Sequence, residues 1–99
     1  MHYLLFYDVV EGYTERRKPS RAAHLEYANR AVARGELVLG GALGDPTDAA
    51  VLLFRSPSRE AAERFAAGDP YVLKGLVKSW RVREWVTVIG PEASVQVNL

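Results

Sequence analysis

The segment HYLLFYDVV (residues 2–10) decides the fold, because it predicts a strand that is apolar on both of its faces. Aromatic and β-branched side chains dominate the segment, as they do in strands generally. Successive side chains of a strand point to opposite faces, which sorts these residues into two apolar rows. The rows are Tyr3, Leu5, Tyr7 and Val9 on one face and Leu4 and Phe6 on the other. A sheet built around this strand therefore has to be covered on both sides.

Helical and strand-like periods alternate along the rest of the chain. The predicted elements are helices at residues 20–34 and 58–67 and strands at residues 2–10, 36–43, 49–55 and 79–89. In the first helix the predicted core-facing stripe is Leu25, Ala28 and Val32, and in the second it is Ala62 and Phe65. Residues 11–19 predict a loop, and the turn residues at 44–48 join two strands into a hairpin.

The element order is β-α-β-β-α-β, which predicts an α+β, ferredoxin-like split βαβ sandwich. Residues 93–99 alternate again and predict a short C-terminal tail strand. The 99 residues are expected to form a single domain, residues 1–99. Two helices cover one face of such a sheet. The other apolar face predicts a homodimer in which two sheets pack face to face around a barrel-like core.

The charge balance and composition exclude several classes of protein. The 13 Lys+Arg against 12 Asp+Glu give a net charge of +1, which predicts neither nucleic-acid nor membrane partners. The chain has no cysteine and only two histidines, so neither a thiolate nucleophile nor a metal site is expected. No secretion signal precedes the first strand, which favours a cytoplasmic location. The basic run at residues 16–18 is interpreted as a solvated loop rather than a phosphate-binding patch.

His24 and Asp69 are the two residues best suited to carry chemistry. His24 lies at the seam between the apolar stripe and the wet face of its helix, where an imidazole suits a general base or acid. Position alone favours a plainer role, a boundary histidine that bonds a backbone carbonyl. Asp69 precedes Pro70 and predicts a helix N-cap. The topology puts Asp69 on the same side of the sheet as His24, where its carboxylate would orient the imidazole if the two met.

Further candidates are weaker when taken alone. Gly41, in the Gly40-Gly41 pair, would let a ligand approach the backbone, although a β-bulge explains the pair more simply. Tyr7 and Tyr71 would line a pocket with aromatic walls, and each also suits the core or a dimer interface.

Taken together, three segments resemble the YCII-related (YciI-like) family. They are HLEYANRAVARGELVLGGAL (residues 24–43), SPSREAAERFAAGDPYVLKGLV (56–77) and the closing VREW (82–85). The resemblance implies a dimeric α/β-barrel type of fold with an active site built around a His–Asp pair, here His24 and Asp69. One branch of the family resembles a dehydrochlorinase that acts on a chlorinated hydroxyhydroquinone, and the wider superfamily includes enzymes like muconolactone isomerase.

The expected function is that of a small, cofactor-independent enzyme for elimination or isomerisation of an aromatic or enolisable metabolite. His24 would be the general base and Asp69 its orienting partner. Pro70 and Tyr71 would shape the substrate pocket, while Tyr7 and the Gly41 backbone would supply polar contacts. The alternatives are a non-catalytic domain that binds a small molecule or serves a partner protein, and a structural dimer whose pocket is only a remnant.

Overall fold

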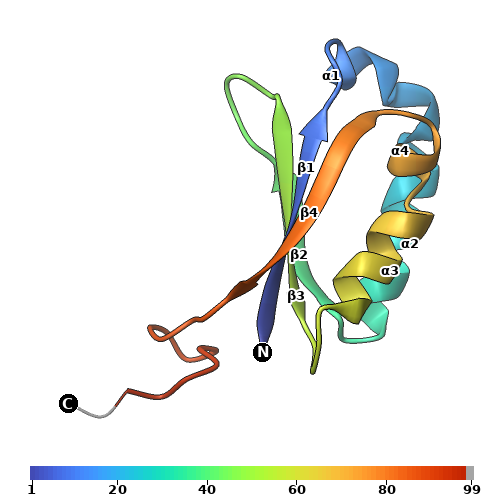
Figure 1. Ribbon diagram of the computed structural model, residues 1–99. Helices are drawn as coiled ribbons and strands as arrows, with labels where there is room; N and C mark the ends of the chain where they lie inside the picture. The colour runs from blue at the N-terminus through green and yellow to red at the C-terminus, as the bar shows by residue number, and fades with distance from the viewer. Residues whose placement is uncertain (98–99) are drawn as a thin grey trace.

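Four antiparallel strands form one sheet in the order β2-β3-β1-β4, in a computed structural model that describes residues 1–97. The strands are β1 (His2–Val9), β2 (Leu37–Ala42), β3 (Ala49–Arg55) and β4 (Val77–Trp85). The helices α2 (Arg21–Ala33), α3 (Glu60–Gly68) and α4 (Pro70–Leu73) lie together on one side of this sheet (Figure 1). This arrangement is the predicted α+β, ferredoxin-like fold, and the prediction is confirmed.

One face of β1 forms the centre of the core, as its alternation predicts. Tyr3, Leu5, Tyr7 and Val9 are all buried. Leu5 pairs with Leu52 of β3, which places both side chains under the helices. From α3, Phe65 packs its ring 5.3 Å from that of Phe54, so the helix layer and the sheet meet through aromatic contacts.

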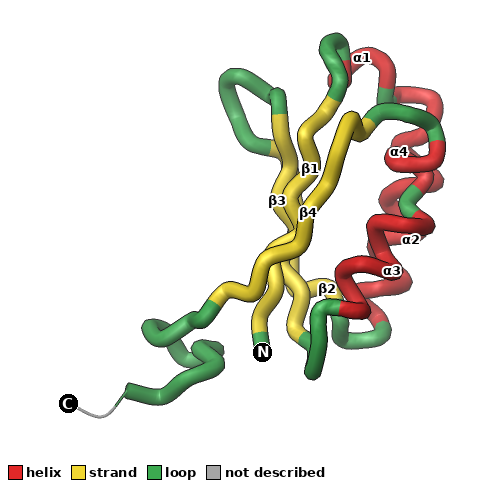
Figure 2. Tube along the Cα trace, viewed as in Figure 1, coloured by secondary structure: helices red, strands yellow, loops and turns green. Residues whose placement is uncertain are grey.

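Among residues 1–97 no helix covers the opposite face of the sheet, and Figure 2 shows the helices on the other side. Leu4 and Phe6 of β1 lie on this open face, beside Leu53 and Val51 of β3. All four side chains are only half-buried in the single chain. The guanidinium of Arg81 lies 4.5 Å from the centre of the Phe6 ring. The open face is thus an apolar strip with the basic side chain of Arg81 beside it.

The segment predicted as a loop at residues 11–19 contains two short helical elements instead. They are α1 (Tyr13–Arg16) and the 3-10 helix η1 (Lys18–Ser20), which runs directly into α2. The physical reason is Tyr13, which is buried and meets the ring of Tyr71 edge-on at 5.7 Å. A buried aromatic side chain fixes the segment against the body, where a solvated loop would leave its apolar area exposed.

The predicted stripe of α2 is not buried in the core, although its half-buried Ala28 packs against the core. Leu25 and Val32 are 44% and 47% exposed, whereas Ala31 is fully buried and His24 and Tyr27 are half-buried. The helix therefore turns the face containing residues 24, 27 and 31 towards the rest of the molecule. The predicted stripe borders a cavity, which is described below.

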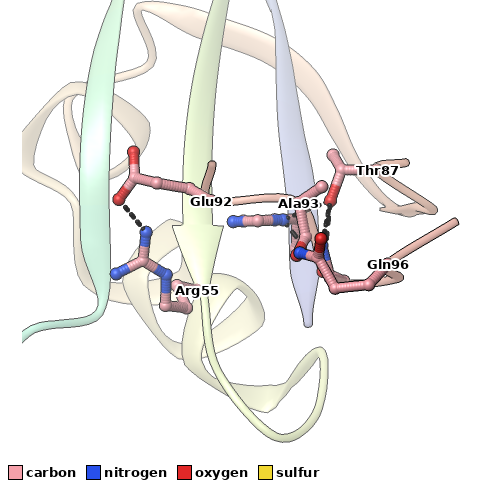
Figure 3. A network of polar contacts seen from close by, with 7 residues as sticks. Arg55, Thr87, Glu92, Ala93 and Gln96 are labelled. Carbon is pink, nitrogen blue, oxygen red and sulfur yellow. Dashed lines mark hydrogen bonds and ion pairs between the residues drawn. The ribbon is translucent and has the colours of Figure 1, made fainter. Parts of the chain in front are cut away.

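The chain after β4 also differs from the prediction. β4 ends at Trp85 rather than at residue 89, and residues 93–97 form no strand; the rest of the predicted tail strand, residues 98–99, lies outside the described residues. Pro91 and Gly90, whose φ is 109°, turn the chain, and the tail then bonds to Thr87. The Ser94 amide donates to the Thr87 hydroxyl at 2.8 Å, and Glu92 pairs with Arg55 (Figure 3). The Ser94 amide and the Glu92 carboxylate of the tail thus find polar partners without a neighbouring strand.

Within residues 1–97, no helix combines the length and the apolar character needed to cross a lipid bilayer.

Gly68 ends α3 at a close approach to α2, which makes it sensitive to substitution. A Cβ at this position would lie 2.6 Å from the Tyr27 hydroxyl, which donates to the Phe65 carbonyl at 2.9 Å. We expect Gly68→Ala to displace Tyr27 and to lower the free energy of unfolding by about 1–3 kcal/mol, measured by urea denaturation. Gly44→Ala is the matched control, because nothing lies within 4 Å of its Cβ position. Equal stabilities of the two variants would contradict the prediction.

Candidate active site

Asp69 is fully buried at the junction of α3 and α4, and its carboxylate accepts three hydrogen bonds. Oδ1 accepts from the backbone N–H of Tyr71 at 3.0 Å, which makes Asp69 the N-cap of α4. The same atom accepts from Nδ1 of His24 at 2.7 Å, across 45 positions of sequence. Oδ2 accepts from the Tyr7 hydroxyl at 2.7 Å. The capping role and the contact with His24 therefore occur together.

His24 lies in the first turns of α2, and its side chain is 15% exposed. Because the Asp69 carboxylate can only accept from Nδ1 when ionised, the neutral imidazole carries its proton there and has its lone pair on Nε2. Nε2 has no hydrogen-bond partner within residues 1–97. The imidazole stacks on the ring of Tyr71 with centroids 3.7 Å apart and planes at 4°. The ring is therefore fixed at one edge and on one face.

Tyr7, which lies in β1, connects Asp69 to the sheet through its hydroxyl. Burial, followed by the adjacent charge of Asp69, raises the pKa of Tyr7 far above its ordinary value. The hydroxyl therefore remains a donor to the carboxylate at any physiological pH. Sequence reasoning expected Tyr7 to contact a substrate, whereas the structure directs its hydroxyl to Asp69.

A cavity of about 260 Å³ lies beside His24, between α2 and the β2–β3 side of the sheet. His24, Tyr7 and Tyr71 line it, and so does Gly41. The apolar wall includes Leu25, Ala28 and Val32, which explains why this stripe of α2 is not in the core. Pro70 occupies the first position of α4 and does not line the cavity.

The Gly40-Gly41 pair is not a bulge, contrary to the simpler interpretation. The irregularity in the pairing of β2 with β3 falls between Leu37 and Leu39. A Cβ at Gly40 would lie 3.0 Å from Cγ of Leu52, whereas the corresponding position at Gly41 is open. Gly40 thus allows close contact with β3 on the helix-covered face. Gly41 pairs with Val51 of the open face and contributes only its backbone to the edge of the cavity.

Sequence reasoning missed three cavity-lining residues that precede His24: Tyr13, Arg17 and Arg21. The guanidinium of Arg17 lies 4.9 Å from the centre of the Tyr13 ring. The signal that could have found them is the spacing of four residues from 13 to 17 and from 17 to 21, which is typical of one helical face.

Among residues 1–97, no three His, Cys, Asp or Glu side chains come together in a group that could hold a metal ion.

Comparison with known proteins identifies one family. The family model of the YCII-related domain matches residues 1–86. No curated protein sequence matches the chain. The tail from residue 87 onwards lies beyond the matched region.

Several solved structures share the fold. A 5-chloro-2-hydroxyhydroquinone dehydrochlorinase from Burkholderia phenoliruptrix AC1100, in complex with 2,5-dihydroxybenzoquinone, is 24% identical, with 89% of this chain and 96% of that chain covered and a TM-score of 0.74. A NIPSNAP family protein from Agrobacterium tumefaciens C58 is 14% identical (96% and 97% covered, TM-score 0.59). An antibiotic biosynthesis monooxygenase is 13% identical (90% and 100% covered, TM-score 0.54). At sequence identities this low, the structural likeness shows that these proteins share the fold of this chain, and nothing more.

The pKa of Tyr7 leads to a prediction for stability in alkali. A tyrosine of the unfolded chain loses its proton near pH 10, whereas folded Tyr7 keeps it, so the free energy of unfolding falls as pH rises above about 10. One such proton contributes a slope of up to about 1.4 kcal/mol per pH unit. Burial also raises the pKa of Tyr27 and of Tyr71, so Tyr7 accounts for part of the total slope.

We therefore expect Tyr7→Phe to reduce this alkaline slope, measured by urea denaturation between about pH 9 and pH 11. The variant also leaves Asp69 one donor short, which lowers the stability at neutral pH by about 1–3 kcal/mol. Tyr3→Phe is the control on the same strand, because among residues 1–97 the Tyr3 hydroxyl hydrogen-bonds only to the Met1 sulfur, at 4.0 Å. An unchanged slope in Tyr7→Phe would show that the hydroxyl is not held in its protonated form by the fold.

Proposed function

The chain belongs to the family of YCII-related domains, and from that premise we propose that it is a small enzyme that takes a proton from an aromatic or enolisable metabolite. His24 acts as the general base and Asp69 as its positioning residue. The observation that carries this proposal is the 2.7 Å contact between His24 Nδ1 and the buried carboxylate of Asp69, beside an open cavity. The reaction is an elimination or an isomerisation.

The contact supports base catalysis because it fixes the imidazole in the useful tautomer. With the Nδ1 proton bonded to Asp69, the lone pair of Nε2 is available to a substrate in the cavity. Asp69 cannot rotate away, since Tyr7 and the Tyr71 amide occupy its other acceptor positions. When Nε2 takes a proton, the nearby carboxylate stabilises the imidazolium that forms.

The proposed steps balance without a redox partner or other cofactor. In an isomerisation, Nε2 takes a proton from a carbon of the substrate and returns it to another atom of the same molecule. In an elimination, Nε2 takes the proton and the leaving group departs with the electron pair of its bond to carbon. The name of the Burkholderia neighbour describes a reaction of this second kind for that protein. Halogenated hydroquinones are therefore among the first substrates to test.

We also propose that the enzyme is a homodimer joined through the open face of the sheet. Leu4, Phe6, Val51 and Leu53 form an apolar strip that no element of the described chain covers. A second copy would bury this strip against its own equivalent, because the same self-complementary surface occurs on both subunits. The hydrophobic effect favours the pairing in proportion to the apolar area removed from water.

His24→Asn and Asp69→Asn test the catalytic pair. Each variant should lower turnover by about 10²- to 10⁴-fold, because the base is lost or is no longer oriented. Turnover is measured as deuterium uptake from D₂O by enolisable ketones and as halide release from halogenated hydroquinones. His2→Asn, which removes the other histidine of the chain far from the cavity lining, is the matched control.

Circular dichroism of each variant separates a loss of activity from a loss of fold. If Asp69→Asn lowers the melting temperature but keeps full turnover, the carboxylate is only a helix cap. If the wild type turns over no substrate of either kind but binds small molecules in the cavity, the domain is a non-catalytic binding module.

Phe6→Glu tests the dimer, because it would bury a carboxylate in the centre of the proposed interface. We expect the wild type to have twice the 11.0 kDa mass of one chain by light scattering, and Phe6→Glu to have the mass of one chain. Leu73→Glu is the matched control, since Leu73 is 68% exposed on α4, away from the open face. A monomeric wild type would contradict the proposal.

A further inference from the structure

The mouth of the cavity is basic. Arg17 and Arg21 both line it, and neither lies within 4.0 Å of a carboxylate among residues 1–97. No Asp or Glu occurs among the lining residues. The nearest buried carboxylate, that of Asp69, is already engaged by His24 and Tyr7. The cavity therefore presents two guanidinium groups whose charge no protein anion neutralises.

Tyr71 adds a hydrogen-bond donor to the same cavity. Its hydroxyl is buried, and no acceptor for its proton occurs within the described chain, which is rare for a buried polar group. Burial, followed by the neighbouring Tyr13, raises the pKa of Tyr71, while the charges of Arg21 and Arg17 and the donor groups of Arg21 act in the opposite direction. The hydroxyl thus keeps its proton and lies within electrostatic range of both arginines. What it lacks is an acceptor.

A row of stacked groups connects the basic mouth to the base. The Arg17 guanidinium lies over Tyr13, Tyr13 meets Tyr71 edge-on, and Tyr71 stacks on His24. Each contact limits the freedom of the next group, so the positions of Arg17 and of His24 are coupled. Leu25 and Val32 line the same cavity and give it an apolar wall without polar side-chain atoms.

We propose that the cavity takes a small organic anion, a carboxylate or an acidic phenolate, whose charged oxygen binds Arg17 and Arg21 and accepts from the Tyr71 hydroxyl. Its apolar body lies against Leu25 and Val32, beside His24. This assignment of the substrate class rests on the site of the proposed function, although binding itself requires no turnover.

The lining of the cavity favours small organic anions over inorganic anions and over neutral apolar molecules. Guanidinium groups donate in a fork that matches two anionic oxygens, and charge-assisted hydrogen bonds of this kind are stronger than neutral ones. A free inorganic anion would leave the apolar wall unused, and a neutral apolar molecule would leave the three donors without acceptors. The volume of about 260 Å³ is below the roughly 300–1,000 Å³ of sites for drug-sized molecules, which restricts the body to about one ring.

Matched pairs of ligands test the proposal by NMR titration of the backbone amides of the whole chain. Benzoate and benzamide have the same shape and differ in charge, and so do butyrate and butyramide. We expect each carboxylate to shift the amide signals of Arg21, His24 and Tyr71 and to bind at least about tenfold more tightly than its amide. For the phenolate arm, 4-nitrophenol should bind more tightly above its own pKa than below it, while benzoate keeps a constant charge over that range.

Substitutions assign the effect to residues. Arg17→Gln and Arg21→Gln should each weaken benzoate binding about tenfold and bring it towards that of benzamide, and Tyr71→Phe should weaken it about threefold to tenfold. Arg16→Gln is the matched control, because it removes the same charge from the adjacent position without touching the cavity. It should change the affinity by less than about twofold. Thermal melting confirms that each variant is folded.

The proposal is overturned if no carboxylate binds more tightly than its amide, or if Arg16→Gln weakens binding as much as Arg17→Gln does. Its failure is distinguishable from failure of the proposed function. Charge-selective binding that survives in His24→Asn without any turnover by the wild type would support the anion site and remove the enzyme. Turnover of neutral ketones with no preference for anions would support the enzyme and remove the anion site.

Discussion

A carboxylate that never meets solvent is the constraint on which the rest of this structure depends. Asp69 joins the central strand, through Tyr7, to the second helix, through His24, and to the start of α4, through the Tyr71 amide. An ionised carboxylate is costly to bury unless it is paired and hydrogen-bonded. The three donors together meet that requirement, so the sheet and both helices are fixed relative to one another by the group that also orients the His24 imidazole.

The cavity follows from small residues at the edge of the sheet. β2 is an edge strand, and on the face beneath α2 it presents Gly40 and Ala42, where larger side chains would fill the space. The apolar stripe of α2 therefore borders an opening instead of packing into the core. The same helix keeps Ala31 fully buried on its other flank, so its position is secured while one side remains open to a ligand.

The sequence was sufficient for the features that depend on local pattern. The alternation in β1, the helices and the capping role of Asp69 all follow from neighbouring residues, and the family resemblance added the pairing with His24. The stripe of Leu25 and Val32 was misplaced because helical period identifies an apolar face but not whether a cavity or a core lies beneath it. The tail was misplaced because Gly90 and Pro91 turn the chain away from the sheet (Figure 1), which the alternation of residues 93–99 does not reveal.

Recognition and reactivity are carried by parts of the molecule with different tolerance to change. His24 and Tyr7 are bonded to the buried carboxylate, so altering them disturbs the fold. Arg17 lies between α1 and η1 and Arg21 is the first residue of α2, and their guanidinium groups make no ion pairs within residues 1–97. Exchanging these two side chains would change the lining of the cavity at little expense in folding. On the proposed function, ligand preference in this scaffold can therefore evolve by substitutions near its surface while the His24–Asp69 contact stays constant.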